Sequence, residues 1–400
     1  MLRYDLIIVG GGLVGAGLAL ALHQTGWRIA LVNAKTPSNE DPRLFALNHS
    51  SCQFLKNLKV WSALAAHAEA IQQVHVSHQG HFGSVRLQSK EVDLETLGHV
   101  IPACHIEAAL NEALLALSHV TLYQPATLTA LQQNEQTATL TLNTMQGELT
   151  LTAPLVIGAD GTLSTVRTQL NLPTREFDYG QSALVTTTSL QRSHAGIAYE
   201  RFTKTGAIAM LPLNGKRCAS IWSAEQALIN HFMTLSDADF LHALQTEFGY
   251  RLGRLQQIGK RFTYPLRLVT AEKTVDQCVL LLGNAAHTLH PIAAQGLNLA
   301  LYEVALLVDL IQAKIKTGDS FSAVQLQEMS AQIQNRQAKS IELSHKLTQI
   351  FSHPNAYMSI GLQLGMIGFN RSSFVKKRFI NSVIGRTGCV PSLLLGQKGL

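Results

Sequence analysis

Short apolar runs and helical patterns alternate along the first 180 positions of the chain, and another such run follows at 278–282. The runs at 6–9, 155–157 and 278–282 have the length and continuous apolar character of strands buried on both faces, and a further strand is expected at 28–32. Helical periodicity follows the first run and recurs from about 47 to 66 and from 106 to 117. This alternation predicts an α/β fold with a parallel sheet.

Between about 180 and 270 the pattern changes, because apolar and polar residues alternate there. Such stretches occupy 183–187, 199–203, 207–213 and 218–222. They are typical of an antiparallel sheet, and a helix at about 237–246 is expected to cover it. A second domain is therefore predicted, inserted before the chain returns to the strand at 278–282. Long helical patterns follow at about 297–316 and 321–351.

Length and charge change this picture only at the C-terminal end. Four hundred residues with 46% hydrophobic content indicate two or three domains with a large core. After Glu342 the chain has no acidic residue and seven basic ones: Lys346, Arg371, Lys376, Lys377, Arg378, Arg386 and Lys398. This tail is either a solvated surface or a contact for anionic lipid or an acidic partner. Nucleic acid is not expected, because no zinc-finger or RRM signature accompanies the charge.

The cysteines and the uncharged apolar runs indicate where in the cell the protein is expected. The five cysteines are odd in number and lack CxxC spacing, which argues against a disulfide framework or a zinc site. The uncharged stretch 6–22 contains five glycines and no A-x-A cleavage pattern follows it, so it is not expected to be a signal or membrane segment. The run 354–370 is either a packed helix or an interfacial membrane contact. A cytoplasmic protein is expected, with a peripheral position at the inner membrane as the alternative.

The first motif with chemical meaning is GxGxxG at the end of the first strand. Gly10 allows a tight turn, Gly12 lets the backbone approach a diphosphate, and Gly15 lets the helix pack on the strand. A dinucleotide site is predicted, with a glycine-rich packing turn as the alternative. Asn33 ends the second strand, where the fingerprint expects an acidic residue on the ribose. Arg43 is either a phosphate contact or a solvated side chain.

Two further motifs follow buried strands. The run 155–157 leads to Asp160 in an Asp-Gly turn, which lies either beside the ligand crevice or in a plain β-turn, and a short helix is expected at Ser164. The run 278–282 breaks at Gly283, crosses a loop and enters a helix at about Leu297. Helix N-termini carry unpaired N–H groups that can hold an anionic or electron-rich ligand group.

A metal site is not expected at the histidines of the second region. His75, His78 and His81 lie close together in the sequence, but no supporting carboxylate or cysteine spacing accompanies them. They are interpreted as surface or sheet histidines.

Together the three motifs occur in the order and spacing of the FAD-dependent aromatic monooxygenases built like 4-hydroxybenzoate hydroxylase. Within that group the chain resembles the ubiquinone-biosynthesis hydroxylases over nearly its whole length, with matching segments at 200–203, 209–212, 283–286 and 288–293. The resemblance implies a Rossmann-like FAD-binding domain with an inserted antiparallel-sheet substrate domain and a helical C-terminal tail. The expected ranges are 1–73, 100–178 and 272–330 for FAD binding, 74–99 and 179–271 for substrate, and 331–400 for the helical region.

The resemblance also implies cofactor contacts for the first motif. Gly10, Gly12 and Gly15 would face the FAD diphosphate. Asn33 would face the adenosine ribose, and Arg43 would lie on the flavin side of the cofactor.

The two later motifs would complete the cofactor site. Asp160 and Asn284 would reach diphosphate or ribityl groups. Gly296, Leu297 and Asn298 would lie near the flavin ring.

Two further positions are implied beside the reacting atoms. Pro291 would shape the wall near the reacting carbon, and His290 is either a catalytic proton-transfer group or a structural histidine. The chain departs from the usual residues of relatives at Asn33, Cys104, Ala294, Tyr302 and Glu303.

The implied chemistry is hydroxylation of the aromatic ring of a prenylated phenol. NAD(P)H would reduce FAD, O₂ would form a flavin C4a-hydroperoxide, and its distal oxygen would attack the ring. The helix near Gly296 would offer its positive dipole end to the reduced flavin. No second GxGxxG is present, so the nicotinamide would bind transiently. Other ubiquinone-biosynthesis proteins are candidate partners.

Two other functions remain open at this point. One is a different flavin oxidoreductase, such as a halogenase or a prenyl reductase, although the Trp-x-Trp typical of halogenases is missing because Trp27, Trp61 and Trp222 are isolated. The other is a non-catalytic partner in a biosynthetic complex.

Overall fold

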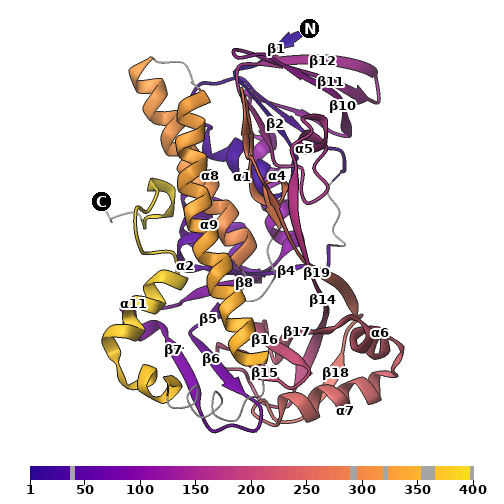
Figure 1. The fold of residues 1–400 in the computed structure, drawn as a ribbon, viewed down its shortest axis with the longest axis vertical. Coiled ribbons are helices and arrows are strands. Elements are labelled where there is room, and N and C mark those ends of the chain that lie inside the picture. The colour runs from indigo at the N-terminus through magenta and orange to yellow at the C-terminus, as the bar shows by residue number, and fades with distance from the viewer. Residues whose placement is uncertain (37–40, 289–294, 319–322, 353–364, 397–400) are drawn as a thin grey trace.

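Four sheets organise the part of the chain that the computed structural model describes, which comprises residues 1–36, 41–288, 295–318, 323–352 and 365–396. Side chains are not described at 323 and 339–352. In Figure 1 the six-stranded sheet and its helices occupy the upper half, and the nine-stranded sheet occupies the lower half. The mixed α/β architecture agrees with the prediction.

The six-stranded sheet contains the buried apolar runs. Its strands, in spatial order, are β20 (Val275–Asp276), β21 (Val279–Leu281), β13 (Val156–Gly158), β2 (Leu6–Val9), β3 (Ile29–Val32) and β9 (Val120–Tyr123). All neighbours from β21 to β9 are parallel. Because β13 lies between β21 and β2, the three sequence motifs leave the same edge of the sheet from adjacent strands.

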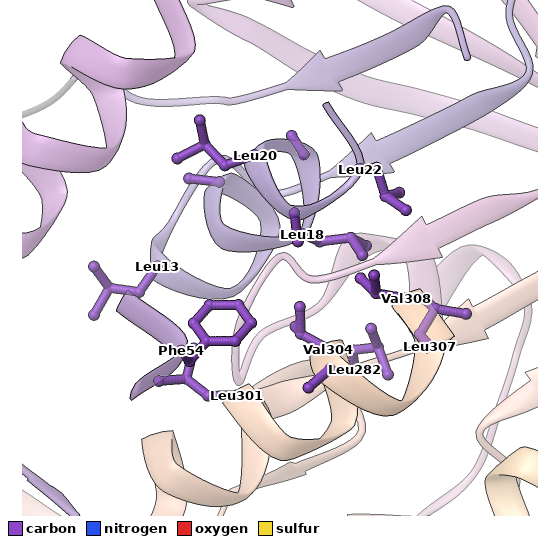
Figure 2. Packing of buried hydrophobic residues seen from close by; sticks show 14 of the residues in the cluster. Leu13, Leu18, Leu20, Leu22, Phe54, Leu282, Leu301, Val304, Leu307 and Val308 are labelled. Carbon is purple, nitrogen blue, oxygen red and sulfur yellow. The ribbon is translucent and has the colours of Figure 1, made fainter. Parts of the chain in front are cut away.

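Two helices pack tightly beside this sheet. Helix α1 (Leu13–Ala21) faces α8 (Gln295–Thr317), and Figure 2 shows Leu13 and Leu18 of α1 with Leu301 and Val304 of α8 around Phe54. Each such buried side chain contributes about 1.5–3 kcal/mol. By length and composition α8 could cross a membrane, but its apolar residues lie in this core, as in the central helix of a globular protein.

The nine-stranded sheet contains most of the alternating stretches. Its members are β22 (His287–Thr288), β19 (Phe262–Ala271), β14 (Thr174–Leu190), β17 (Arg217–Glu225), β16 (Gly206–Leu213), β15 (Ile197–Thr203), β6 (Gln73–His78) and β7 (Ser84–Gln88), with β18 (Leu255–Ile258) beside β14. The pairs are antiparallel except β15 with β6. The strand β22 follows the six-stranded sheet in sequence but pairs with β19.

Two helices cover one face of this sheet. Helix α7 (Asp237–Phe248) agrees with the prediction, whereas α6 (Gln226–Thr234) was not predicted. The two pack on Trp222, which is 1% exposed and contacts Phe232 and Phe240. These two helices leave the opposite face of the sheet uncovered.

A three-stranded sheet and the first helices connect the two large sheets. It is formed by β4 (Leu44–Asn48), β8 (Gly98–Pro102) and β5 (Glu69–Ile71). No strand was predicted at 44–48. The helical stretch predicted to follow is divided into α2 (His49–Asn57) and α3 (Trp61–Leu64), because Lys59 adopts a left-handed φ of 60° between them.

The remaining elements lie around these layers. A four-stranded sheet contains β1 (Leu2–Arg3), β12 (Gly147–Ala153), β11 (Ala138–Thr144) and β10 (Ala126–Gln133). The helices are α4 (Ala103–Leu115), α5 (Thr165–Gln169), α9 (Ala323–Ser352) and α11 (Ser373–Val383), with short helical turns η1 (Ala65–His67), η2 (Ser89–Val92), η3 (Gly283–Ala285) and η5 (Ser392–Leu394). Residues 365–371 are also helical.

Candidate cofactor and substrate site

The turns after β2 and β13 lie against each other. Gly10 has a φ of 112°, and a Cβ there would meet the carbonyl oxygen of Ala159 at 2.3 Å. The Ala159 N–H donates to Val9 O at 2.7 Å, and the Leu282 N–H donates to Gly158 O at 2.9 Å. These bonds align the ends of three strands, so the predicted residues of the first two motifs are brought together.

Gly12 and Gly15 have different surroundings in α1. A Cβ on Gly15 would lie 1.9 Å from Gly10 O, so this glycine is required for the helix to approach the strand. A Cβ on Gly12 would meet nothing within 4 Å. Gly12 is the N-cap of α1 and makes no side-chain cap. Gly12 is also exposed, so an anionic group can approach the backbone closely at the N-terminus of α1.

Asn33 and Asp160 both lie against the glycine turn, Asn33 at Gly11 and Asp160 at Gly10. The Asn33 side chain packs on Gly11, where an added Cβ would come within 2.6 Å of its Nδ2. The Asp160 carboxylate accepts the Ser164 hydroxyl at 2.5 Å and the Val166 N–H at 3.1 Å. Asp160 thus organises the start of α5, which the Ser164 side chain caps by accepting the Arg167 N–H.

Arg43 is held by two carboxylates. Its Nε donates to the Asp41 oxygens at 2.9 and 2.8 Å, and its Nη2 lies 3.3 Å from Glu107 of α4. Burial alone would raise the pKa of Asp41, but the hydrogen bonds and charge of Arg43 bring it below its ordinary value. Arg43 is therefore paired with two protein carboxylates, and its contact with the cofactor remains a prediction.

A buried carboxylate organises the turn after β21. Glu303 of α8 is 0% exposed; it accepts the Gly283 N–H at 2.9 Å and the Nε2–H of His287. Arg167 adds a second clamp, because its Nη1 donates to Ala285 O at 2.8 Å. Between these buried anchors Asn284 is exposed. The turn therefore presents Asn284 outward from a rigid base.

The first turn of α8 is hydrogen-bonded to β4. A Cβ on Gly296 would meet nothing within 4 Å, and Leu297 packs on the main core. The Asn298 side chain accepts the Asn48 N–H at 2.9 Å and donates to Ala46 O at 3.0 Å. The two predicted catalytic positions, His290 and Pro291, lie outside the described residues.

A cavity of about 1430 Å³ begins at this end of α8. Gln295, Asn298 and Tyr302 line one part of it. The rest is bounded by β6, β7, β15, β16 and β17, by α9 and by residues 365–389. The lining is mostly apolar, so the cavity suits a ligand with a large hydrophobic part.

Sequence reasoning missed the role of the Glu303 cluster. Glu303 was noted only as a departure, and His287 was not singled out. The available signal was a lone acidic residue among apolar positions of a core helix, because such a residue is almost never fully buried without partners. The bond of Arg167 to Ala285 joins residues 118 positions apart, so no local pattern predicts it.

The residues present fit the expected FAD. Gly12 leaves the space a diphosphate needs at the N-terminus of α1, and Gly296 leaves comparable space at the start of α8. Gln295 Oε1 is buried and has no hydrogen-bond partner within the described part of the chain, so it is ready to accept a bond from a ligand. The contacts to Asn33, Asp160 and Asn284 remain predictions.

Comparisons with known proteins agree with this site. The family model for an FAD binding domain matches residues 3–323, and that for squalene epoxidase matches 256–394. Ubiquinone hydroxylase UbiL of Rhodospirillum rubrum is 31% identical over 95% of this chain and 89% of its own length. The 3-demethoxyubiquinol 3-hydroxylase of Escherichia coli is 30% identical over 80% of this chain and 82% of its own.

A solved structure shows the same fold. The p-nitrophenol 4-monooxygenase PnpA from Pseudomonas putida DLL-E4 has a TM-score of 0.81 and 17% identity, with 100% of both chains covered. The family model covers most of the chain, and two relatives reach 30% identity over at least four fifths of it. The chain therefore belongs to the FAD-dependent aromatic hydroxylases, within the group that acts in ubiquinone biosynthesis.

Proposed function

We propose that this enzyme hydroxylates the ring of a prenylated phenol bound in the 1430 Å³ cavity. The observation that carries the proposal is continuity: the cavity extends from Gln295 and Asn298, beside the expected flavin, along the apolar faces of β6, β15 and β16. A phenol ring bound between α8 and these strands would leave its prenyl chain against the remaining apolar lining of the cavity. Each buried methylene contributes about 0.8 kcal/mol, so the chain would supply much of the binding energy.

The protein's own residues position the substrate and exclude water. FAD, reduced by NAD(P)H, supplies the oxygen-transfer chemistry with O₂ when it is bound. The N-terminus of α8 offers its positive dipole end to negative charge near the flavin ring. Asn298 and Asn48 hold α8 against β4, so that this end of the cavity keeps its shape during catalysis.

We also propose that the chain divides as expected from its sequence. The six-stranded sheet supports an FAD-binding domain of 1–73, 100–178 and 272–330. The nine-stranded sheet supports a substrate domain of 74–99 and 179–271, and the helices after 331 would form the third part.

The proposed function is tested with the purified protein and a short-chain 2-prenylphenol. We expect stoichiometric FAD and NAD(P)H oxidation that rises with the phenol and yields hydroxylated product, identified by mass spectrometry. Hydrogen peroxide as the only product of NAD(P)H oxidation, across prenyl chain lengths, would contradict the proposal. A protein that cannot be reconstituted with FAD would contradict it more deeply.

We propose in addition that the C-terminal region binds the inner membrane from the cytoplasmic side. Phe374 and Val375 of α11 are 74% and 46% exposed, Lys377 follows them, and Phe82 on the hairpin between β6 and β7 is 81% exposed. Apolar side chains beside cations are typical of interfacial helices. This surface would bring a lipid-dissolved substrate to the cavity.

Other enzymes of ubiquinone biosynthesis are proposed partners.

Replacing Phe374 with Ser is expected to weaken binding to anionic vesicles several-fold, because the exposed ring would no longer enter the interface. Co-sedimentation with phosphatidylglycerol vesicles measures the effect. Leu115→Ser is the matched control, since Leu115 is 77% exposed at the end of α4, on a different helix. Equal loss in both variants, or no binding by the unmodified protein, would contradict the membrane proposal.

A further inference from the structure

One carboxylate lies on the apolar wall of the cavity. Glu200 of β15 lines it together with Ala198 and Phe202, its neighbours on the same face of the strand. Across the sheet Glu200 is paired with Ala209 of β16 and Val76 of β6. Each of these neighbours is apolar, so none of them compensates for the charge of Glu200.

The carboxyl group of Glu200 is also without a partner in the described part of the protein, where neither a hydrogen bond nor an ion pair reaches it. A polar group in such surroundings is costly unless a ligand satisfies it. Glu200 is partly exposed, and it lines the cavity. Among the described residues that line the cavity, no other acidic side chain is present.

The other titratable groups that line the cavity do not form a hydrogen bond or an ion pair with Glu200 within the described residues. Arg336 of α9 stacks on the Tyr302 ring, with Cζ 3.8 Å from its centroid. The Tyr302 hydroxyl donates to Cys389 O at 3.3 Å. Arg378 of α11 and Tyr199 of β15 also line the cavity. Burial, rather than any of these groups, raises the pKa of Glu200 to about 7.

We propose that Glu200 binds the phenolic hydroxyl of the substrate and removes its proton during hydroxylation. This inference rests on the proposed function and assigns a catalytic residue to it. The proton moves from the phenol oxygen to a carboxylate oxygen, and the O–H bonding pair stays on the phenolate. The phenolate pushes electron density into the ring and makes it more reactive toward an electrophilic oxygen. The proton returns to the product hydroxyl, which regenerates the carboxylate.

The chemistry of the pocket selects this ligand group. A hydroxyl can donate to the carboxylate, and an aromatic ring fits the apolar surroundings of Val76 and Ala209. A carboxyl group with a pKa near 7 is matched to proton transfer at physiological pH. Below pH 7 Glu200 holds its own proton and cannot accept another, so kcat is expected to fall on the acid side.

The first experiment measures binding and is independent of turnover. Calorimetry at pH 8 compares a short-chain 2-prenylphenol with its methyl ether on the holoenzyme. The unmodified enzyme is expected to prefer the phenol by about tenfold or more, as for a hydrogen bond to a charged group. Glu200→Leu keeps a side chain of similar size and is expected to lose this preference. Equal affinity of the unmodified enzyme for both ligands overturns the inference.

The second experiment measures kcat between pH 5.5 and 9. Glu200→Gln is expected to lower kcat about 100-fold and to remove the acid limb near pH 7. Glu148→Gln is the control, because Glu148 is exposed on β12. An unchanged acid limb in Glu200→Gln overturns the inference. Loss of binding or of hydroxylation in the unmodified enzyme would instead contradict the proposed function on which it rests.

Unfolding of the variants is not expected to obscure these results. The folded-state pKa of about 7 is above the ordinary Glu value of 4.5, so the folded form binds the extra proton. The contribution of Glu200 to stability therefore falls as pH rises from about 4.5 to 7. Both Glu200 variants are expected to have an equal or higher Tm than the unmodified enzyme at pH 8.

Discussion

Gly15→Ala is expected to lower the free energy of unfolding by about 3 kcal/mol or more and to abolish FAD retention. The added Cβ would lie 1.9 Å from the carbonyl oxygen of Gly10 and 3.1 Å from Cγ2 of Ile8. Backbone cannot move aside as a flexible side chain can, so α1 must shift away from β2. The glycine turn would then lose its shape, because Gly10 is also pressed against Ala159.

Gly12→Ala is the matched control from the same turn of helix. Its Cβ meets no protein atom within 4 Å, so the free energy of unfolding of the apoprotein is expected to change by about 1 kcal/mol or less. FAD affinity should still fall on the order of tenfold, because the methyl group would occupy the space beside the diphosphate. Urea unfolding of the apoproteins and fluorescence titration with FAD separate the two effects. If Gly12→Ala bound FAD as tightly as the unmodified protein, the diphosphate would not lie beside Gly12.

Glu303→Ala is expected to destabilise the protein by about 2–6 kcal/mol, because two buried donors each lose their acceptor at a cost of about 1–3 kcal/mol. It leaves the Gly283 N–H and the imidazole of His287 without their acceptor in a site where His287 is 1% exposed. FAD affinity should fall as well, since Asn284 is the next residue along this turn. Denaturant unfolding and FAD content measure the two losses.

The contrast with Glu303→Gln shows what the second acceptor oxygen contributes. The amide keeps an oxygen that can accept one of the two bonds, so a smaller loss of about 1–3 kcal/mol is expected. Glu112→Ala, at an exposed position of α4, controls for loss of an acidic side chain in general. If Glu303→Ala were as stable as Glu112→Ala, the turn after β21 would have to be held by other contacts.

The sequence predicted those parts of the fold and site whose constraints are local. The apolar run of β2 and the spacing of Gly10, Gly12 and Gly15 lie within one strand–turn–helix unit, and the structure places them as such a unit. The strand β4 was not predicted, because it is stabilised by pairing with β8, some fifty residues later.

The sequence pattern could not predict which side chains from distant parts of the chain contact each other. The sequence did not show that Glu107 of α4 pairs with Arg43, and the contact of Arg43 with the cofactor stays a prediction. The sequence placed Glu200 in an alternating strand and in the segment 200–203 that resembles the ubiquinone-biosynthesis hydroxylases, without a chemical role. Alternation gives the face on which a side chain lies, but it does not show that β6 and β16 leave Glu200 among Val76 and Ala209.

One wall of the cavity is formed by residues near the C-terminus, which the ribosome synthesises last. Asn48 donates through Nδ2 to Val383 O at 3.1 Å, and residues 365–389 line the cavity opposite β6 and β15. The glycine turns and the six-stranded sheet need the chain only as far as β21, whereas this wall leaves the ribosome about 100 residues later. A nascent chain can therefore assemble its nucleotide-binding sheet before it has an enclosed place for a phenol.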